Sequence, residues 1–329
     1  MSLPDFEQQL LLTLIISQSL HFFWLEALRT LPEMPLSSTW RKQLKDLCFK
    51  HTTHYLAQKK TLFELDMLFE KERIPYAIFK GAHIREVIYA NPACRSSADI
   101  DILVTPNQKT SAIRTLCASG YTLSATLANV SHEVTLVKDN VHVDLHWHIM
   151  RLGRTRIDLT DLYLQSRQRC NFFWSLDNDM TLIVLLTHPV FTEYSAGPQS
   201  SAKLADLRRW ITTQAIDWQR VLCLLEESGM KTAAWITATL LADLTGCHLP
   251  THIYKAISPK NPKHFLLQQW LSLNLSSKFA AYPIFPKYIF TLLAHDNLSD
   301  IFRFIRMFRA ERQKDVAAME HVQQAAQGN

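Results

Sequence analysis

The sequence predicts an α+β protein in which a small mixed sheet with flanking helices is preceded and followed by helical regions. Before residue 73, apolar residues recur at spacings of three and four, which is typical of helices. Short apolar or alternating runs then predict strands up to residue 150, and the helical spacing returns beyond Leu159. A chain of 329 residues is long enough for two or three such units. We therefore divide it into residues 1–72, 73–150 and 151–329.

The first 72 residues are expected to be mainly helical. Their apolar run from Leu10 to Leu20 is preceded by Asp5 and Glu7 and is interrupted by polar residues at 17–19. A signal peptide would carry basic residues there, and a membrane span needs about 20 mainly apolar residues. We therefore expect a buried helix and no transmembrane segment.

Composition and charge narrow the class of protein. Apolar residues make up 47% of the chain and charged residues 20%, which is typical of soluble globular proteins. The six cysteines are scattered without a CxxC pair, which disfavours a disulfide framework or a zinc site and predicts a reducing cytoplasm. The excess positive charge lies between residues 255 and 315, a stretch that contains 10 basic and 4 acidic side chains.

Residues 74–148 predict a compact unit of about five strands and two helices. The run IPYAIF reaches a turn at Gly81, and the helix that follows ends before Pro92. Thr105 is a candidate N-cap for the second helix, with Pro106 as its first residue. After the strand that starts at Ile74, the further expected elements are a helix at 82–91, a strand at 99–104, a helix at 105–120, strands at 121–127, 132–138 and 141–147, and a turn at 138–140.

Two carboxylates in the predicted strand DIDILV carry the first chemical signal. Asp99 and Asp101 share one face, because side chains alternate along a strand. Burying two like charges without a partner is unfavourable, so a cation is expected between them. Asp144, in the later strand VHVDLHW, joins them if the two strands are neighbours. Three carboxylates within coordination distance suit one or two Mg²⁺ ions.

A second signal is the stretch FKGAHIREV. Gly81 falls between a strand and a helix, in a chain that has only seven glycines. A glycine there lets a phosphate approach the backbone, and the helix N-terminus behind it offers N–H groups. Lys80 adds a mobile cation beside it.

Together, these motifs resemble a known family. Lys80-Gly81, Arg95 followed by DIDILV, GY, a histidine-bearing strand and VDLHW occur in this order. The order resembles the uncharacterised bacterial nucleotidyltransferase family of the DNA polymerase β-like superfamily. The resemblance is close over residues 74–150 and continues through LADLRRW and IDWQRVL, which are similar to the family's helical C-terminal portion. Many superfamily members have Gly-Ser where this chain has Gly81-Ala82.

The resemblance implies roles for these residues. Asp99 and Asp101 would hold Mg²⁺, or alternatively Mn²⁺, at the phosphates of an NTP, and Asp144 would complete a second metal site and help to deprotonate the acceptor. Gly81 would contact phosphate. Lys80 and Arg95 would neutralise its charge, and for Arg95 a structural ion pair with the carboxylates is the alternative.

The implied reaction moves a nucleoside monophosphate from an NTP to a hydroxyl-bearing acceptor and releases pyrophosphate. The acceptor is unidentified: RNA such as tRNA, a protein, a peptide and a small molecule all fit. The alternative function is a catalytically inactive nucleotide-binding or interaction module with the same fold.

Histidines on the last predicted strand allow a competing hypothesis. His142, Asp144, His146 and His148 alternate and would face one side, an arrangement in which a hydrolase can present ligands to Zn²⁺. That hypothesis does not explain the two aspartates of DIDILV. His146 and His132 can contact the substrate or serve as structural histidines.

Beyond Leu159 the candidate elements are helices. Asp206 lies on one of them and can reach the site or pair with Arg208 or Arg209. A later helix carries arginines three residues apart, which can dock RNA phosphate or another acidic partner, or form a solvated face. Those arginines are Arg303, Arg306, Arg309 and Arg312.

Overall fold

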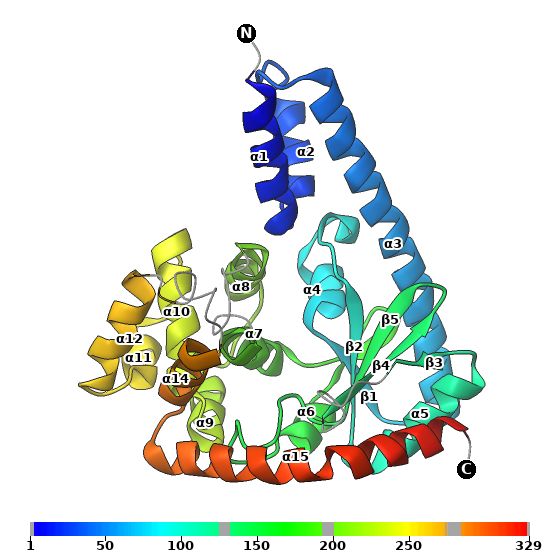
Figure 1. Cartoon of the computed structure of the whole chain (residues 1–329), viewed down its shortest axis with the longest axis vertical. Helices are drawn as coiled ribbons and strands as arrows, with labels where there is room; N and C mark the ends of the chain where they lie inside the picture. Colours follow the sequence, from blue (N-terminus) through cyan, green and yellow to red (C-terminus); the bar gives the residue numbers. More distant parts are fainter. Residues whose placement is uncertain (1–2, 125–131, 193–200, 274, 276–283, 328–329) are drawn as a thin grey trace.

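The computed structural model describes residues 3–124, 132–192, 201–273, 275 and 284–327. Seven strands of these residues form one mixed sheet in the order β3-β4-β5-β2-β1-β7-β6 (Figure 1). The strands are β1 (Tyr76–Phe79), β2 (Asp99–Val104), β3 (Thr122–Leu123), β4 (Glu133–Lys138), β5 (Val141–His146), β6 (Gln168–Cys170) and β7 (Phe173–Ser175). The α+β fold class predicted from the sequence is confirmed.

Five strands lie where the sequence predicts them. The turn between β4 and β5 has Asp139 and Asn140 at φ of 50° and 61°, the left-handed conformation that tight hairpins use. The strand predicted at 121–127 is described only as β3, and its residues from 125 onward lie outside the described residues. The segment after Thr105 starts as a 3-10 turn, Pro106–Gln108, before α5 (Lys109–Ala118), and Thr105 makes no side-chain cap.

Strands β6 and β7 are not predicted by the sequence. They belong to the region expected to be helical, yet they extend the sheet at its β1 edge. Strand β7 pairs in parallel with β1, with Ile78 opposite Ser175. The sheet is therefore completed by residues well beyond 150.

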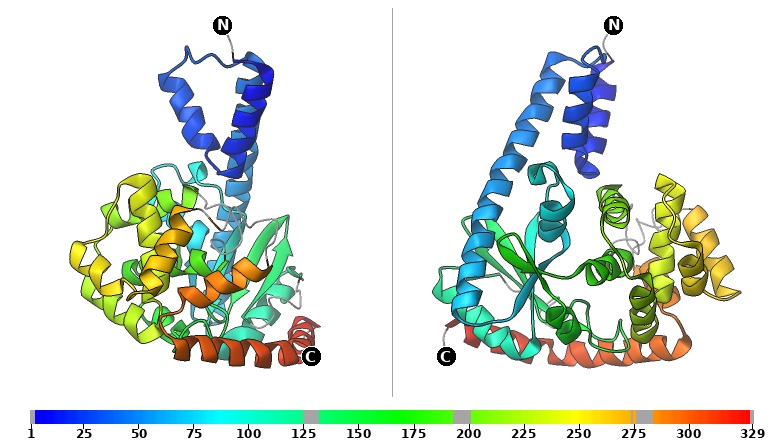
Figure 2. Two further views of the ribbon diagram at one scale, coloured as in Figure 1. Left: turned by 60° about the vertical axis from the view of Figure 1, so that its left-hand side comes forward. Right: turned by 180° about the vertical axis from the view of Figure 1, so that it is seen from behind.

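One face of the sheet is covered by helices from both ends of the chain. Alternate strand residues such as Ile78, Ile102 and Val143 pack against the C-terminal half of α3 (Ser38–Lys71) and against α5. The last turns of α15 (Leu298–Gln327) join the same core through Val322 and Ala325. Figure 2 shows α3 along this face and α15 running beneath the sheet.

The opposite face carries the polar strand residues and meets the C-terminal helices. Phe79 and Leu103 pack there into a core built with α4 (Lys80–Ile88) and α7 (Asn178–Thr192). Pro189 lies inside α7 and does not end it. Among the described residues, this half also contains the helices α6 (Thr160–Gln165), α8 (Ser201–Thr213), α9 (Trp218–Ser228), α10 (Lys231–Thr245), α11 (Thr251–Ile257), α12 (Lys263–Ser272) and α14 (Ile284–Ala294).

The N-terminal helices α1 (Asp5–Ser17) and α2 (His21–Thr30) pack on the first half of α3 (Figure 1). Only one face of α1 is buried, through Leu12 and Ile15, whereas Leu10 and Leu14 are 61% and 57% exposed. The prediction of a buried helix is therefore correct for the face of α1 that carries Leu12 and Ile15 and wrong for the face that carries Leu10 and Leu14. Among the described residues, no helix has the length and apolar character needed to span a membrane.

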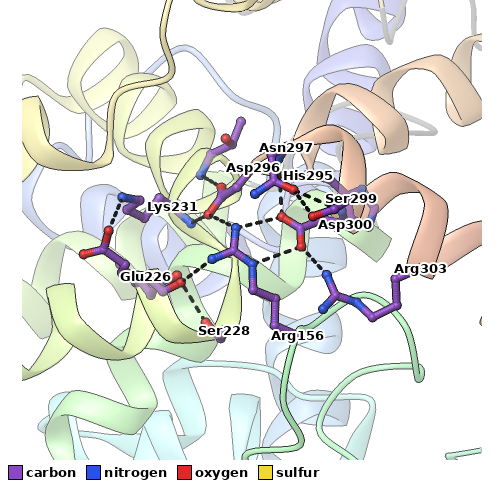
Figure 3. A network of polar contacts seen from close by, with 12 residues as sticks. Arg156, Glu226, Ser228, Lys231, His295, Asp296, Asn297, Ser299, Asp300 and Arg303 are labelled. Carbon is purple, nitrogen blue, oxygen red and sulfur yellow. Dashed lines mark hydrogen bonds and ion pairs between the residues drawn. The ribbon is translucent and has the colours of Figure 1, made fainter.

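A polar network fastens the loop between β5 and α6 to the C-terminal helices. Arg156 donates to both carboxylate oxygens of Asp300, at 3.0 and 2.8 Å, and to the backbone oxygen of Glu226 (Figure 3). Asp296 accepts from the backbone N–H groups of Lys231 and Thr232 at the start of α10. The network holds α9, α10 and α15 at fixed positions around this loop.

Candidate functional site

Asp101 and Asp144 lie directly opposite each other on the neighbouring parallel strands β2 and β5. On both strands the alternate residues enter the core, which leaves the acids on the opposite face. Oxygens of Asp101 and Asp144 and a ring nitrogen of His146 all lie within 4.8 Å of one another. The condition set by the sequence, that the two acidic strands be neighbours, is met.

Asp101 is buried between two basic groups. Lys80 Nζ lies 2.7 Å and His146 Nε2 2.9 Å from its Oδ1 atom. Burial alone would raise the pKa of Asp101, but the Lys80 ammonium and His146 together lower it to about 2. This carboxylate is therefore ionised.

The negative charges of Asp99 and Asp144 are balanced less well by nearby basic groups than that of Asp101. Burial, and then repulsion from Asp101 and Asp144, raise the pKa of Asp99 to about 6. Burial also raises the pKa of Asp144, although the Thr135 hydroxyl donates to its Oδ1 at 2.6 Å. Asp99 is not part of the group within 4.8 Å, but it lines the same cavity.

Glu133 was not singled out from the sequence. It lies on β4 opposite His146, and its Oε2 is 3.0 Å from His146 Nδ1. Burial raises the pKa of Glu133, but His146 outweighs this and lowers it to about 2. The alternation of Val134 and Leu136 in the sequence indicates that Glu133 lies on the face of β4 away from the core, but only the register with β5 brings it to His146. His132 lines the cavity, and burial lowers its pKa to about 3.

The strand-to-helix turn places Gly81 at the cavity. Lys80 has a φ of 55°, which is unusual for a residue with a side chain, and no side chain caps the start of α4. A Cβ atom on Gly81 would lie 2.4 Å from Ser97 Oγ. A side chain at position 81 would therefore have to displace the Ser97 hydroxyl, which occupies that space.

Arg95 forms an ion pair, but with a different acid from those expected. Its Nη2 lies 2.8 Å and its Nε 2.9 Å from Oδ2 of Asp206 on α8. Tyr89 donates to the same carboxylate at 2.7 Å. The Asp206 side chain is 1% exposed, and its ion pair is with Arg95 rather than with the neighbouring Arg208 or Arg209.

A cavity of about 1020 Å³ joins these residues to distant parts of the chain. Lys50, His51 and His54 of α3 line it, as do His188 of α7 and Lys203 of α8. Burial, and then Arg95 and Lys80, lower the pKa of Lys203 to about 8. No sequence pattern predicts these residues at the site, because only the tertiary fold brings them to the sheet.

The family model described as uncharacterised nucleotidyltransferase matches residues 4–246. This chain belongs to that family. The match includes α1 to α3, the whole sheet and the helices through α10, so every residue of the site from Lys80 to Asp206 lies within it. No curated protein matched the chain.

The donor set of this chain fits a divalent metal ion. The carboxylates of Asp101 and Asp144 converge beside His146, and burial, followed by repulsion from these two acids, raises the pKa of Asp99. A further cation would offset that negative charge. The zinc arrangement of four alternating residues is not formed. His142 is exposed and His148 lies 2.8 Å from Asp158, so of those four only Asp144 and His146 reach Asp101.

The basic helix near the C-terminus is only partly as expected. Arg303 bonds to Asp300 within the network of Figure 3, whereas Arg306 and Arg309 are exposed. The side chain of Arg312 lies outside the described residues. The docking of an acidic partner on this helix stays a prediction.

Proposed function

We propose that this nucleotidyltransferase moves a nucleoside monophosphate from an NTP to a hydroxyl group of an acceptor and releases pyrophosphate. The pairing of Asp101 with Asp144 across β2 and β5, at the wall of a cavity of about 1020 Å³, is the observation that supports this most strongly. RNA such as tRNA, a protein, a peptide and a small molecule are the acceptor classes that fit the reaction.

In this proposal, Asp99, Asp101 and Asp144 hold Mg²⁺, or alternatively Mn²⁺. The bound metal supplies neutralisation of the phosphate charge. The acceptor oxygen forms a bond to the α-phosphorus, and the bond from that phosphorus to the oxygen bridging to the β-phosphate breaks. Pyrophosphate leaves with the electron pair, and Asp144 accepts the acceptor's proton. Burial raises the pKa of Asp144, which favours that role.

The triphosphate would bind at the start of α4. The uncapped helix N-terminus and the Gly81 backbone offer N–H groups, and Lys80 and Lys203 supply positive charge. We assign Arg95 a positioning role, because its ion pair with Asp206 holds α8, the helix that carries Lys203. His146 orients Asp101, and His132 contacts the substrate from the cavity wall.

Thermal unfolding with each of the four NTPs, with and without Mg²⁺, tests the proposal. A ligand at a hundred times its Kd stabilises the folded state by about 2.7 kcal/mol, which corresponds to a few degrees for a chain of this size. We expect Mg²⁺-dependent stabilisation by at least one NTP, lost in Asp101→Asn and in Asp144→Asn. Asp161→Asn, at an exposed position on α6, is the matched control and should keep it.

The outcomes separate the two functions. Stabilisation that survives both substitutions would show that these acids do not hold the metal. Stabilisation without pyrophosphate release, over a broad set of acceptors, would favour the inactive nucleotide-binding module. If no NTP shifts the unfolding temperature, an interaction module is favoured and the proposal fails.

A further inference from the structure

The outer face of α3 carries a row of exposed apolar side chains, which we call the α3 stripe. Phe49, Leu56, Phe63 and Met67 are 73%, 58%, 46% and 67% exposed. The residues of the opposite face, including Leu44, Leu62 and Leu65, are fully buried. A single exposed apolar side chain is ordinary, but four along one helix face are typical of an interface.

The stripe has the spacing of a helix-pairing seam. Positions 42, 45, 49, 52, 56, 60, 63, 67 and 70 follow one another at intervals of three and four. Counted outward from Leu56, they fall 4, 7, 11 and 14 residues away in both directions. The row is therefore the same in either direction, which a two-fold symmetric, antiparallel pair requires.

The chemistry of the stripe also fits its own copy in reverse. In an antiparallel pair centred on Leu56, that residue meets itself and Phe49 meets Phe63 of the second copy. Lys42 then faces Glu70 of the second copy, and the stem of Lys45 covers Met67. Phe63 already stacks on Phe172 at 3.8 Å between ring centroids, so this aromatic position is fixed before pairing.

Charge decides the direction of the pair. Before Leu56 the positions of the seam carry Lys42 and Lys45 and no acid, whereas after it they carry Lys60 and Glu70. A parallel pair would bring the basic halves together and would set Lys42 against Lys42. An antiparallel pair separates them.

We propose that two copies of this chain associate through the α3 stripe as an antiparallel helix pair with its two-fold axis at Leu56. The opposite side of the same helix carries Lys50, His51 and His54 into the cavity. Pairing therefore braces a wall of the proposed substrate site from outside without contributing a residue to it.

Sedimentation equilibrium of the full chain tests the association. We expect a dimer for the wild type and a rise in the dimer dissociation constant of more than about tenfold for Leu56→Glu, because a charge at the centre of the seam is desolvated. Leu56 is exposed, so the monomeric variant should still fold, with the far-ultraviolet circular dichroism of the wild type. Its unfolding temperature should fall only by what the lost association contributes. Phe265→Glu, at a 58% exposed position on α12, is the control and should remain dimeric. A monomeric wild type, or a Leu56→Glu dimer of unchanged affinity, would overturn the proposal.

Cysteine cross-linking tests the direction. In a Cys223→Ser background, which removes the exposed cysteine, Leu56→Cys should cross-link to its own copy with a short bis-maleimide. Phe49→Cys and Phe63→Cys should cross-link when mixed but not singly. Self-cross-linking of Phe49→Cys, with no cross-link between the two different variants in the mixture, would mean a parallel pair and would refute the antiparallel arrangement.

Discussion

The ammonium of Lys80 lies 2.7 Å from Oδ1 of Asp101, the carboxylate that we propose as a metal ligand. Lys80 reaches it from the residue directly after β1, with a left-handed backbone. The protein thus carries its own counter-charge for Asp101. A metal ion and Lys80 would compete for the same oxygen, and this relationship gives the first prediction.

Replacing Lys80 with Met should destabilise the metal-free protein by about 1–3 kcal/mol, because a buried carboxylate loses one of its two partners. Mg²⁺ should restore part of the lost free energy of unfolding, measured by urea titration. Lys138→Met is the control, because it removes the ion-pair partner of Glu64 at a position outside the site. Mg²⁺ should not restore the free energy of unfolding that this variant loses. Equal recovery of both variants would contradict a metal at Asp101.

Gly81→Ala should weaken Mg²⁺-NTP binding, because the new methyl group would lie 2.4 Å from Ser97 Oγ and displace it. Overpacking of this kind destabilises by about 1–3 kcal/mol. Ser97→Ala removes the clashing oxygen, so the double variant should recover most of the affinity measured by calorimetry. If the double variant binds no better than Gly81→Ala, the clash is not the cause.

NTP affinity should depend on the protonation of Lys203, whose pKa is about 8. The ammonium is present below that pH and is lost as the pH rises, so affinity should fall above it. Bound phosphate moves the fall to higher pH, because it favours the charged form. Lys203→Met should bind about tenfold more weakly at neutral pH and lose the dependence. Lys203→Arg should stay charged and bind well at high pH. A wild-type profile in Lys203→Met would exclude this role.

Acid should destabilise the fold through His83, which is fully buried with neither ring nitrogen hydrogen bonded. Burial lowers its pKa to about 3. The folded state keeps it neutral while the unfolded state takes up a proton below its ordinary pKa, so stability is lost as the pH falls. Between pH 7.5 and pH 5 this amounts to about 2 kcal/mol. His83→Leu should remove that part of the loss in urea titrations at both pH values. His142→Leu, at an exposed position, should not.

The acidic face was predictable because the period of two in DIDILV and VHVDLHW needs no tertiary information. The other residues of the site were not predictable in this way. Glu133 belongs to the site through its register with His146, and Lys203 through the packing of α8, and neither relation is local in sequence. Strands β6 and β7 have three residues each, too few for an alternating pattern. The division of the chain at residues 72 and 150 stays a prediction.

The core beneath the sheet contains side chains from α3 and from the last turns of α15, such as Leu65 and Val322. After a ribosome has synthesised β5, it still needs roughly 10–35 s to reach those last turns, at about 5–20 residues per second. During that time the nascent sheet lacks part of its cover. Holdase chaperones should therefore bind ribosome-attached chains that end before α15, and should release them once this helix has emerged.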